Sequence, residues 1–431
     1  MGRDARKAVR LLAMLVVAAA LLVPWVADAA SKPAAKAAKA PAGWVFTATN
    51  NPAGNQVIVF KRGSDGKLTQ SATVSTGGKG IASEPPFGFP IVDSSGSINL
   101  TADGKLLFVV NAGSNSITSF KVTDSGLKKV SVVGSNGKLP ISLASSSGHL
   151  LYVVNEASQN ISGWRFTPDG KLSSIKGSKE SLTAVTPKGA KDKVGLAAGI
   201  GFVNNGGVVA VTQRGLPRTY GEIDTFLIDR NGAAGPSKAF ATRGVANPFG
   251  FSSVGSYLLV SNAGLVKTPS GAMPNPADFS QFTGSAATYK VSLDGKVRLV
   301  KNVPSGGRAA CWLIVEHNGR TAFVTNTLSS GTPPAGRPTS GKGAVSSLSV
   351  GGNGALKLLK QADTSPGFPG DEAVSHDDKY LYVSVPSIIV PGGSHLEVYK
   401  LGSNGSMTRI QTVPSTNPST YTPAFSGIGA F

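Results

Sequence analysis

The stretch Asp103-Gly104-Lys-Leu-Leu-Phe-Val-Val-Asn111 decides the fold, because its pattern returns at Ser147-Gly148-His-Leu-Leu-Tyr-Val-Val-Asn155. Each copy places a turn before an apolar run that ends in Asn. Further copies start at Gly255, Asn318 and Asp377. A four-strand unit that recurs every ~40 to 60 residues is typical of small sheets arranged radially, as in a β-propeller.

Two sets of tight turns indicate how many units the chain contains. We letter the four strands of each unit A to D from the centre outward. Asp-Gly and Asn-Gly are strong hairpin signals, because both residue types tolerate the positive φ that a tight turn needs. The A–B turns are Asp103-Gly104, Ser147-Gly148, Asn205-Gly206, Val254-Gly255, Asn318-Gly319 and Asp377-Asp378. The C–D turns are Asp65-Gly66, Ser125-Gly126, Asp169-Gly170, Asn231-Gly232, Asp294-Gly295, Asn353-Gly354 and Asn404-Gly405.

One A–B turn is missing, because the first unit starts at strand B, Trp44 to Asn50. The apolar tail Phe425-Ser-Gly-Ile-Gly-Ala-Phe431 can supply the missing strand A from the far end of the chain. The sequence therefore predicts an all-β fold, a seven-bladed propeller over residues 44–431, closed by pairing of the C-terminal strand with the N-terminal blade. Its hydrophobic content of 40% argues against a disordered, Gly-rich chain.

The N-terminus has the pattern of an export signal. Basic residues precede the apolar run Leu11 to Val26, and Ala27-Asp28-Ala29 fits a cleavage site. The apolar run is shorter than the ~20 residues of a spanning helix, which disfavours an uncleaved anchor. We expect a signal peptide at 1–29, an Ala/Lys/Pro linker at 30–43, and a mature protein that is secreted or periplasmic.

The formal net charge is +19, and it is +17 without the four basic and two acidic residues of 1–29. Such a charge favours anionic partners, including acidic carbohydrates and cell-envelope polymers. The Lys residues are scattered through turns, so no nucleic-acid partner is predicted. We expect a monomer without a cofactor, since no loop has the dense Asp/Asn/Gly spacing of a metal site.

Loop lengths point to one face of the propeller. A–B and C–D connections are tight, whereas all insertions fall in the B–C and D–A connections on the opposite face. Function collects on long loops held by a rigid scaffold, so we expect the site at that mouth of the channel. The long loops are 213–221, 262–285, 326–343 and 386–394 between B and C, and 77–97, 177–196 and 362–370 between D and A.

Several motifs resemble the lactonase family of seven-bladed propellers, which includes 6-phosphogluconolactonase and carboxymuconate-cyclising enzymes. The resemblance extends from about Trp44 to Phe431 and implies a lactone hydrolase. Family enzymes use a His in a Pro-His motif at the start of an inner strand, together with Arg and Glu. The motifs are Leu151-Tyr-Val-Val-Asn155-Glu156, Asn247-Pro-Phe-Gly-Phe251, Ala310-Cys-Trp312 and Phe323-Val-Thr-Asn326.

This chain lacks that His, since the comparable positions read Leu139-Pro140-Ile141 and Asn247-Pro248-Phe249. Lactone opening still needs a base to activate water and a positive group for the developing oxyanion. Carboxylates and arginines at the ends of inner strands can supply both. The predicted catalytic residues are Arg308, Glu156, Arg214, Asp371 and Glu372.

Two functions remain open at this point. The first is a lactonase-type enzyme that acts on a lactone or a sugar-acid derivative. The second is a non-catalytic module that binds an anionic glycan, an envelope polymer or a partner protein through the long-loop face. The single cysteine, Cys311, lies in an apolar run and is interpreted as a small buried residue.

Overall fold

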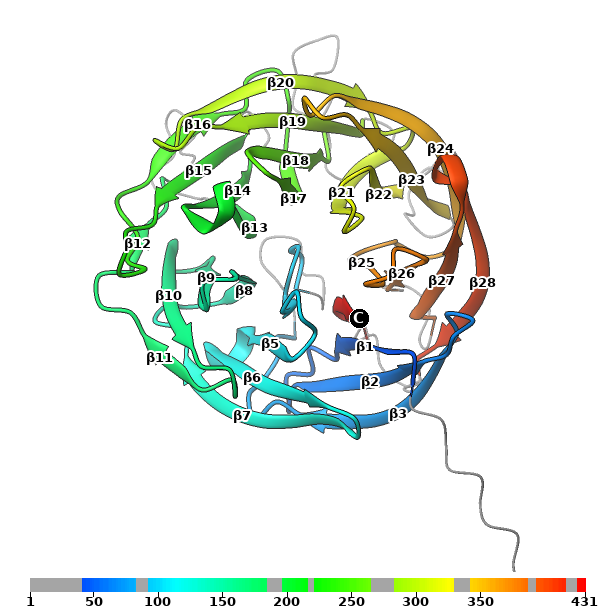
Figure 1. The fold of residues 1–431 in the computed structure, drawn as a ribbon, viewed down its shortest axis with the longest axis horizontal. Coiled ribbons are helices and arrows are strands. Elements are labelled where there is room, and N and C mark those ends of the chain that lie inside the picture. The colour runs from blue at the N-terminus through cyan, green and yellow to red at the C-terminus, as the bar shows by residue number, and fades with distance from the viewer. Residues whose placement is uncertain are drawn as a thin grey trace, which may run out of the picture. The chain divides into compact units, whose positions relative to one another are not determined.

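The computed structural model describes residues 41–82, 92–183, 196–215, 221–264, 283–328, 342–386, 393–415 and 425–431. Residues 41–431 form one compact unit, and their strands form seven sheets arranged around a central axis (Figure 1). The predicted propeller is therefore confirmed. The predicted signal peptide lies outside the described residues. Within the described ranges, no helix is long and apolar enough to cross a membrane.

Each sheet is one blade, whose strands follow one another from the inner to the outer edge. Blade 1 contains β29 (Ser426–Ala430), β1 (Gly43–Ala48), β2 (Gln56–Arg62) and β3 (Leu68–Ser75). Blade 2 contains β4 (Ile98–Leu100), β5 (Leu106–Asn111), β6 (Ser116–Thr123) and β7 (Gly126–Gly134). Blade 3 contains β8 (Pro140–Ser145), β9 (Leu150–Asn155), β10 (Asn160–Phe166) and β11 (Leu172–Ser174), with β12 (Glu180–Ser181) also paired to β10.

The remaining four blades repeat this order. Blade 4 contains β13 (Leu196–Val203), β14 (Val208–Arg214), β15 (Gly221–Leu227) and β16 (Lys238–Ala241). Blade 5 contains β17 (Pro248–Val254), β18 (Tyr257–Asn262), β19 (Ser285–Val291) and β20 (Val297–Pro304). Blade 6 contains β21 (Arg308–Val315), β22 (Thr321–Leu328), β23 (Lys342–Val350) and β24 (Leu356–Pro366), and blade 7 contains β25 (Glu372–Val374), β26 (Tyr380–Val385), β27 (His395–Leu401) and β28 (Met407–Pro414).

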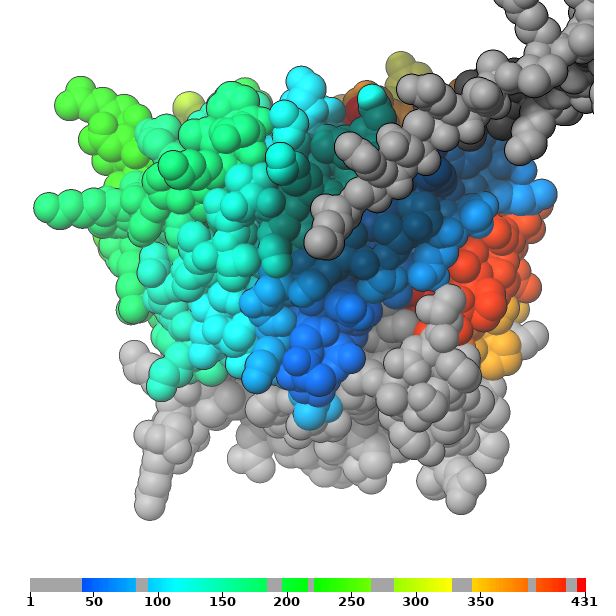
Figure 2. All heavy atoms as spheres, turned by 90° about the horizontal axis from the view of Figure 1, so that it is seen from below, coloured from blue at the N-terminus to red at the C-terminus, as the bar shows by residue number. Residues whose placement is uncertain are grey.

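Blade 1 closes the ring as predicted, because its inner strand comes from the C-terminus. Strand β29 runs antiparallel to β1, with Val45 opposite Ala430 and Thr47 opposite Ile428. The Thr47 hydroxyl also donates to the Gly427 carbonyl at 2.7 Å. Both views place the blue first blade beside the red and orange last blade (Figures 1 and 2). The inner strand of blade 1 is therefore supplied by the opposite end of the same chain.

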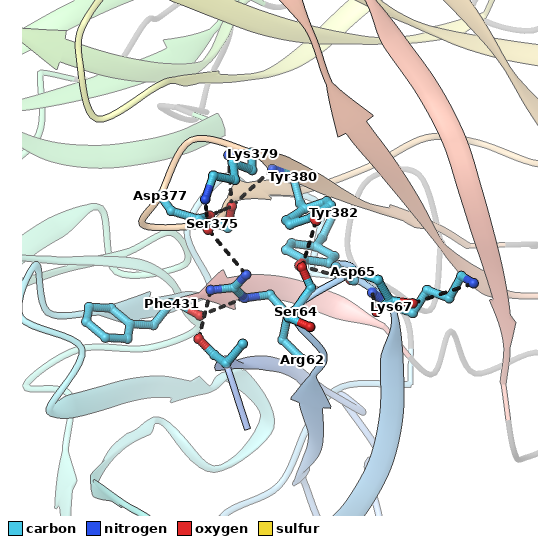
Figure 3. A network of polar contacts seen from close by, with 12 residues as sticks. Arg62, Ser64, Asp65, Lys67, Ser375, Asp377, Lys379, Tyr380, Tyr382 and Phe431 are labelled. Carbon is cyan, nitrogen blue, oxygen red and sulfur yellow. Dashed lines mark hydrogen bonds and ion pairs between the residues drawn. The ribbon is translucent and has the colours of Figure 1, made fainter. Parts of the chain in front are cut away.

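Arg62 reinforces the closure from the tight-turn face (Figure 3). Its guanidinium donates to the carbonyls of Ala42 and Phe431, at 2.9 and 3.4 Å. It also lies 3.6 Å from the Asp377 carboxylate of blade 7 and 5.8 Å from the centroid of the Tyr380 ring. One nearly buried cation thus joins the start of the propeller, its last residue and an A–B turn.

A hydroxyl also joins each blade to the next at six of the seven boundaries. In most blades the hydroxyl belongs to a Ser or Thr of strand C. In blades 3 and 7 the corresponding strand C residue is Gly163 or Val398, and the Tyr paired with it on strand B supplies the hydroxyl instead. Each hydroxyl donates to the carbonyl of a C–D turn glycine that has a positive φ. The pairs are Ser119–Gly170, Tyr152–Gly232, Thr225–Gly295, Thr288–Gly354, Ser347–Gly405 and Tyr382–Gly66, at 2.6 to 3.2 Å.

Burial follows the position of a strand within its blade. Strands β5 and β9 are buried at every residue, because neighbouring blades cover both of their faces. The outer strand β7 is mostly exposed and carries lysines, which protect its unpaired edge. The apolar B-strand motif that revealed the repeat is therefore the core of each blade.

Candidate functional site

A cavity of about 560 Å³ lies at the centre of the ring. Its volume is in the range that suits a small-molecule ligand. Inner-strand residues of all seven blades line it, and A–B turn residues such as Ser147 and Asn205 line it as well. At the other end of these strands, Ser95 and Gly96 belong to its wall.

Residues 92–97, which we call the crossing segment, connect several inner strands. The Ser95 amide donates to the Ala198 carbonyl at 2.7 Å, and the Leu143 amide donates to the Gly96 carbonyl at 2.9 Å. The Trp312 indole donates to the Ser94 carbonyl at 2.9 Å. The segment therefore holds together blades 3, 4 and 6 at the end of the cavity opposite the A–B turns.

Glycine is needed within the crossing segment. Gly96 has φ of 77°, and a β-carbon there would lie 3.3 Å from the Ser142 hydroxyl. Its amide donates to Asp371 Oδ2 at 3.3 Å. This close approach connects the crossing segment to blade 7 and to one of the predicted catalytic carboxyls.

Arg214 and Glu156 are brought together, and the crossing segment supplies a second carboxylate. Arg214 Nη1 lies 2.5 Å from Asp93 Oδ2, and Nη2 lies 3.5 Å from Glu156 Oε1. Arg214 and Glu156 are each 6% exposed. The Arg214 charge is thus balanced by two carboxylates, and the ion pairs fix the crossing segment to blades 3 and 4.

Aromatic packing supports the same ion pairs. The Arg214 guanidinium lies 5.3 Å from the centroid of the Phe249 ring, and that ring packs edge-on against Trp312 at 4.9 Å. Cys311 packs beside them. Burial, together with the charge of Asp93, raises the pKa of the Cys311 thiol to about 12, so it is no nucleophile at neutral pH.

Asp371 and Glu372 also line the cavity, and they are 8% and 3% exposed. Burial raises the pKa of Asp371 to about 7, although the Gly96 and Glu372 amides oppose the shift. Burial and the neighbouring Asp371 charge raise the pKa of Glu372 well above its ordinary value, against the Ile314 amide. Neither Glu372 carboxyl oxygen has a hydrogen-bond partner of good geometry among the described residues.

Four of the five predicted residues thus fall into two groups that the crossing segment links. Arg308 is the exception, because it neither lines the cavity nor forms an ion pair with a described residue. Sequence reasoning missed Asp93, Gly96 and the Phe249–Trp312 pair. No local pattern marks Asp93 and Gly96, since Val92 to Ser97 reads as an ordinary turn-rich loop. Phe249 and Trp312 lie in two of the motifs that carry the resemblance, but no pattern in the sequence pairs them.

The predicted long loops can be followed only in part. Much of each B–C insertion and of the loop 177–196 lies outside the described residues. Within the described ranges, no group of three His, Cys, Asp or Glu side chains is arranged to hold a metal ion. The site is therefore described through the cavity, the crossing segment and the two charged groups.

Known proteins share this architecture. The family model described as "Lactonase, 7-bladed beta-propeller" matches residues 51–186. A candidate 6-phosphogluconolactonase from Bacteroides fragilis superimposes with a TM-score of 0.63 and 14% identity, over 90% of this chain and 98% of that chain. The periplasmic gluconolactonase of Pseudomonas aeruginosa gives 0.61 and 16%, over 90% and 98%.

A protein from Lactobacillus plantarum gives a TM-score of 0.61 and 14% identity, over 90% of this chain and 99% of that one. No curated protein sequence matches the chain. The family match confirms the resemblance to lactonase propellers that the motifs predict. At these identities, the solved structures show the shared fold alone.

Proposed function

We propose that this propeller hydrolyses a lactone in its central cavity, with Asp371 and Glu372 as the acid–base pair. The observation that carries the proposal is the position of two adjacent, buried carboxyls with raised pKa on the cavity wall. Carboxyls of this kind are typical of catalytic sites. The lactonase match and the fold of the gluconolactonase support the choice of reaction.

The two carboxyls have different roles in this reaction. With a pKa of about 7, Asp371 takes a proton from water while the water oxygen bonds to the lactone carbonyl carbon. The raised pKa of Glu372 favours its protonated form, which in this reaction donates a hydrogen bond to the developing oxyanion. The ring C–O bond then breaks, and Asp371 returns its proton to the leaving ring oxygen. One water is added, and the product is a hydroxy acid.

Arg214, Glu156 and Asp93 position this pair rather than contact the substrate. Their ion pairs hold the crossing segment, whose Gly96 amide donates to Asp371. The crossing segment lies at the long-loop end of the cavity, and the lining reaches the A–B turns. Substrate therefore enters from the tight-turn face in this proposal, and Arg308 has no part in the chemistry.

The proposal is tested by proton release from a panel of lactones, with spontaneous hydrolysis subtracted. The expected result is activity that falls ~10²- to 10⁴-fold in Asp371→Asn and in Glu372→Gln. Asp124→Asn, an exposed carboxyl in a C–D turn, is the control and should keep full activity. Wild-type activity in Asp371→Asn would refute the site, and no activity on any lactone would refute the reaction.

A non-catalytic binding module is the second candidate. The charge of +19 and the crossing segment, which occupies one end of the cavity, favour it. A folded protein that hydrolyses no lactone, yet binds an anionic glycan or an envelope polymer in a salt-dependent way, would support this function instead.

We further propose that the protein acts outside the cytoplasm, because residues 1–29 carry the pattern of a cleaved signal peptide. N-terminal sequencing of the protein recovered from periplasm or medium tests this proposal. A mature N-terminus near Ala30 is expected. An intact Met1 in the cytoplasmic fraction would contradict it.

A further inference from the structure

The charge of the cavity restricts which lactones it accepts. We infer that the substrate is an uncharged, polyhydroxylated lactone, and that phosphorylated or otherwise anionic lactones are rejected. This inference rests on the proposed function and adds the substrate class. It is drawn from the lining residues and not from the relatives, one of which is named for a phosphorylated substrate.

The first observation is the absence of cations along the described wall. The described residues that line the cavity include Asp371 and Glu372 but no Lys and no Arg. His317 is the one His among them, and its Nδ1 lies 3.0 Å from Asp378 Oδ1 on a neighbouring A–B turn. A phosphate group would therefore lose its hydration without meeting a Lys or Arg on the described wall.

The second observation is that the charge of Arg214 is already balanced by carboxylates. Arg214 lies between Asp93 and Glu156, so its single charge meets two carboxylates. Arg214 is also absent from the cavity wall. Although the chain carries +19 in total, no Lys or Arg among the described residues lies on the wall, where Asp371 is the group that ionises near neutral pH.

The third observation is that the rest of the wall carries neutral hydrogen-bonding groups. Within its blade each inner strand pairs with a neighbour on one side only. Apart from the bonds that the crossing segment makes to Leu143 and Ala198, the N–H and C=O groups of the other edge face the channel. Ser145, Ser146, Asn204 and Asn205 add further neutral donors and acceptors. Ligand hydroxyls both donate and accept hydrogen bonds, so a polyhydroxylated ring matches this wall better than an apolar or a charged one.

The same electrostatics helps product release. Hydrolysis converts a neutral lactone into a hydroxy acid, which ionises to a carboxylate beside the Asp371 carboxylate. Like charges at close range repel each other, and the repulsion is strong where water is largely excluded. We therefore expect the carboxylate product to inhibit weakly, with an inhibition constant at least ~10-fold above the KM of the lactone.

The experiment compares an uncharged aldonolactone with the same lactone phosphorylated on its terminal hydroxyl. For the full mature chain, we expect kcat/KM to be at least ~100-fold higher for the uncharged form. Equal or better turnover of the phosphorylated form would overturn the inference while the proposed function stands. Hydrolysis of neither form would instead count against the proposed function.

Calorimetric binding of non-hydrolysable analogues keeps the inference testable without turnover. The uncharged lactam should bind and its phosphorylated form should not. Binding of the phosphorylated lactam with equal affinity would overturn the inference.

Ser253 offers a variant pair, because it lines the cavity and is itself exposed. Ser253→Lys should reduce the preference for the uncharged over the phosphorylated form ~10-fold, whereas the uncharged control Ser253→Gln should leave this preference unchanged. If the two variants do not differ, the cause of the preference is not electrostatic.

Discussion

The pH dependence of stability gives a direct test of the state of Asp371. Burial raises the pKa of Asp371 from 3.8 to about 7 in the folded protein. Between these two values the folded state binds more protons than the unfolded state, so stability must fall as pH rises. Each pH unit in this window changes the free energy of unfolding by about 1.4 kcal/mol.

Replacing Asp371 by Asn removes this titration and should reduce the fall in stability with rising pH. From pH 5 to pH 8, the wild-type protein should lose about 2.5 kcal/mol through Asp371, because the loss stops near pH 7. The change also removes the Asp371 charge, which raises the pKa of Glu372. The measurement is guanidinium unfolding of both proteins at both pH values, so that the pH-independent effect of the substitution cancels.

The control for this experiment is Asp124→Asn, which removes an exposed carboxyl that does not line the cavity. It should keep the wild-type difference between the two pH values. If Asp371→Asn retains the wild-type difference as well, then Asp371 is not a buried acid with a raised pKa, and its assignment as the base fails.

Three further changes test other parts of the structure. Arg214→Met should destabilise the fold by about 3–5 kcal/mol, since it removes the cation between buried Glu156 and partly buried Asp93, and an unchanged unfolding midpoint would refute the ion pairs. Ser347→Ala should cost about 1 kcal/mol through its lost bond to the Gly405 carbonyl, and Ser349→Ala on the same strand should cost less. Deleting residues 426–431 removes the inner strand of blade 1, so cooperative unfolding should be lost, and a cooperative transition near the wild-type midpoint would contradict the closure.

The blade count and the ring closure could be predicted from the sequence, because their signals are local. A Gly or Asn at a tight turn marks each hairpin wherever the chain later lies. The missing A–B turn before Trp44 left one inner strand unassigned, and the tail ending at Phe431 was the one apolar segment left to fill it. Turn chemistry and strand periodicity together therefore determined the topology.

The candidate site could be predicted only in part, because its decisive contacts are long-range. Arg214, Glu156, Asp371 and Glu372 stand at strand ends, which the repeat locates. Their partners Asp93 and Gly96 do not stand at strand ends. They belong to a loop whose path no periodicity in the sequence encodes. The depth of burial that sets the two raised pKa values also depends on how that loop crosses the ring.

The pH dependence of kcat/KM on an uncharged lactone tests the catalytic pair most directly. The account predicts that kcat/KM rises through about pH 7 as Asp371 loses its proton. Asp371→Asn should lose the rising limb along with most of the rate. A profile that is flat from pH 5 to pH 9, or one that Asp371→Asn leaves intact, would contradict it.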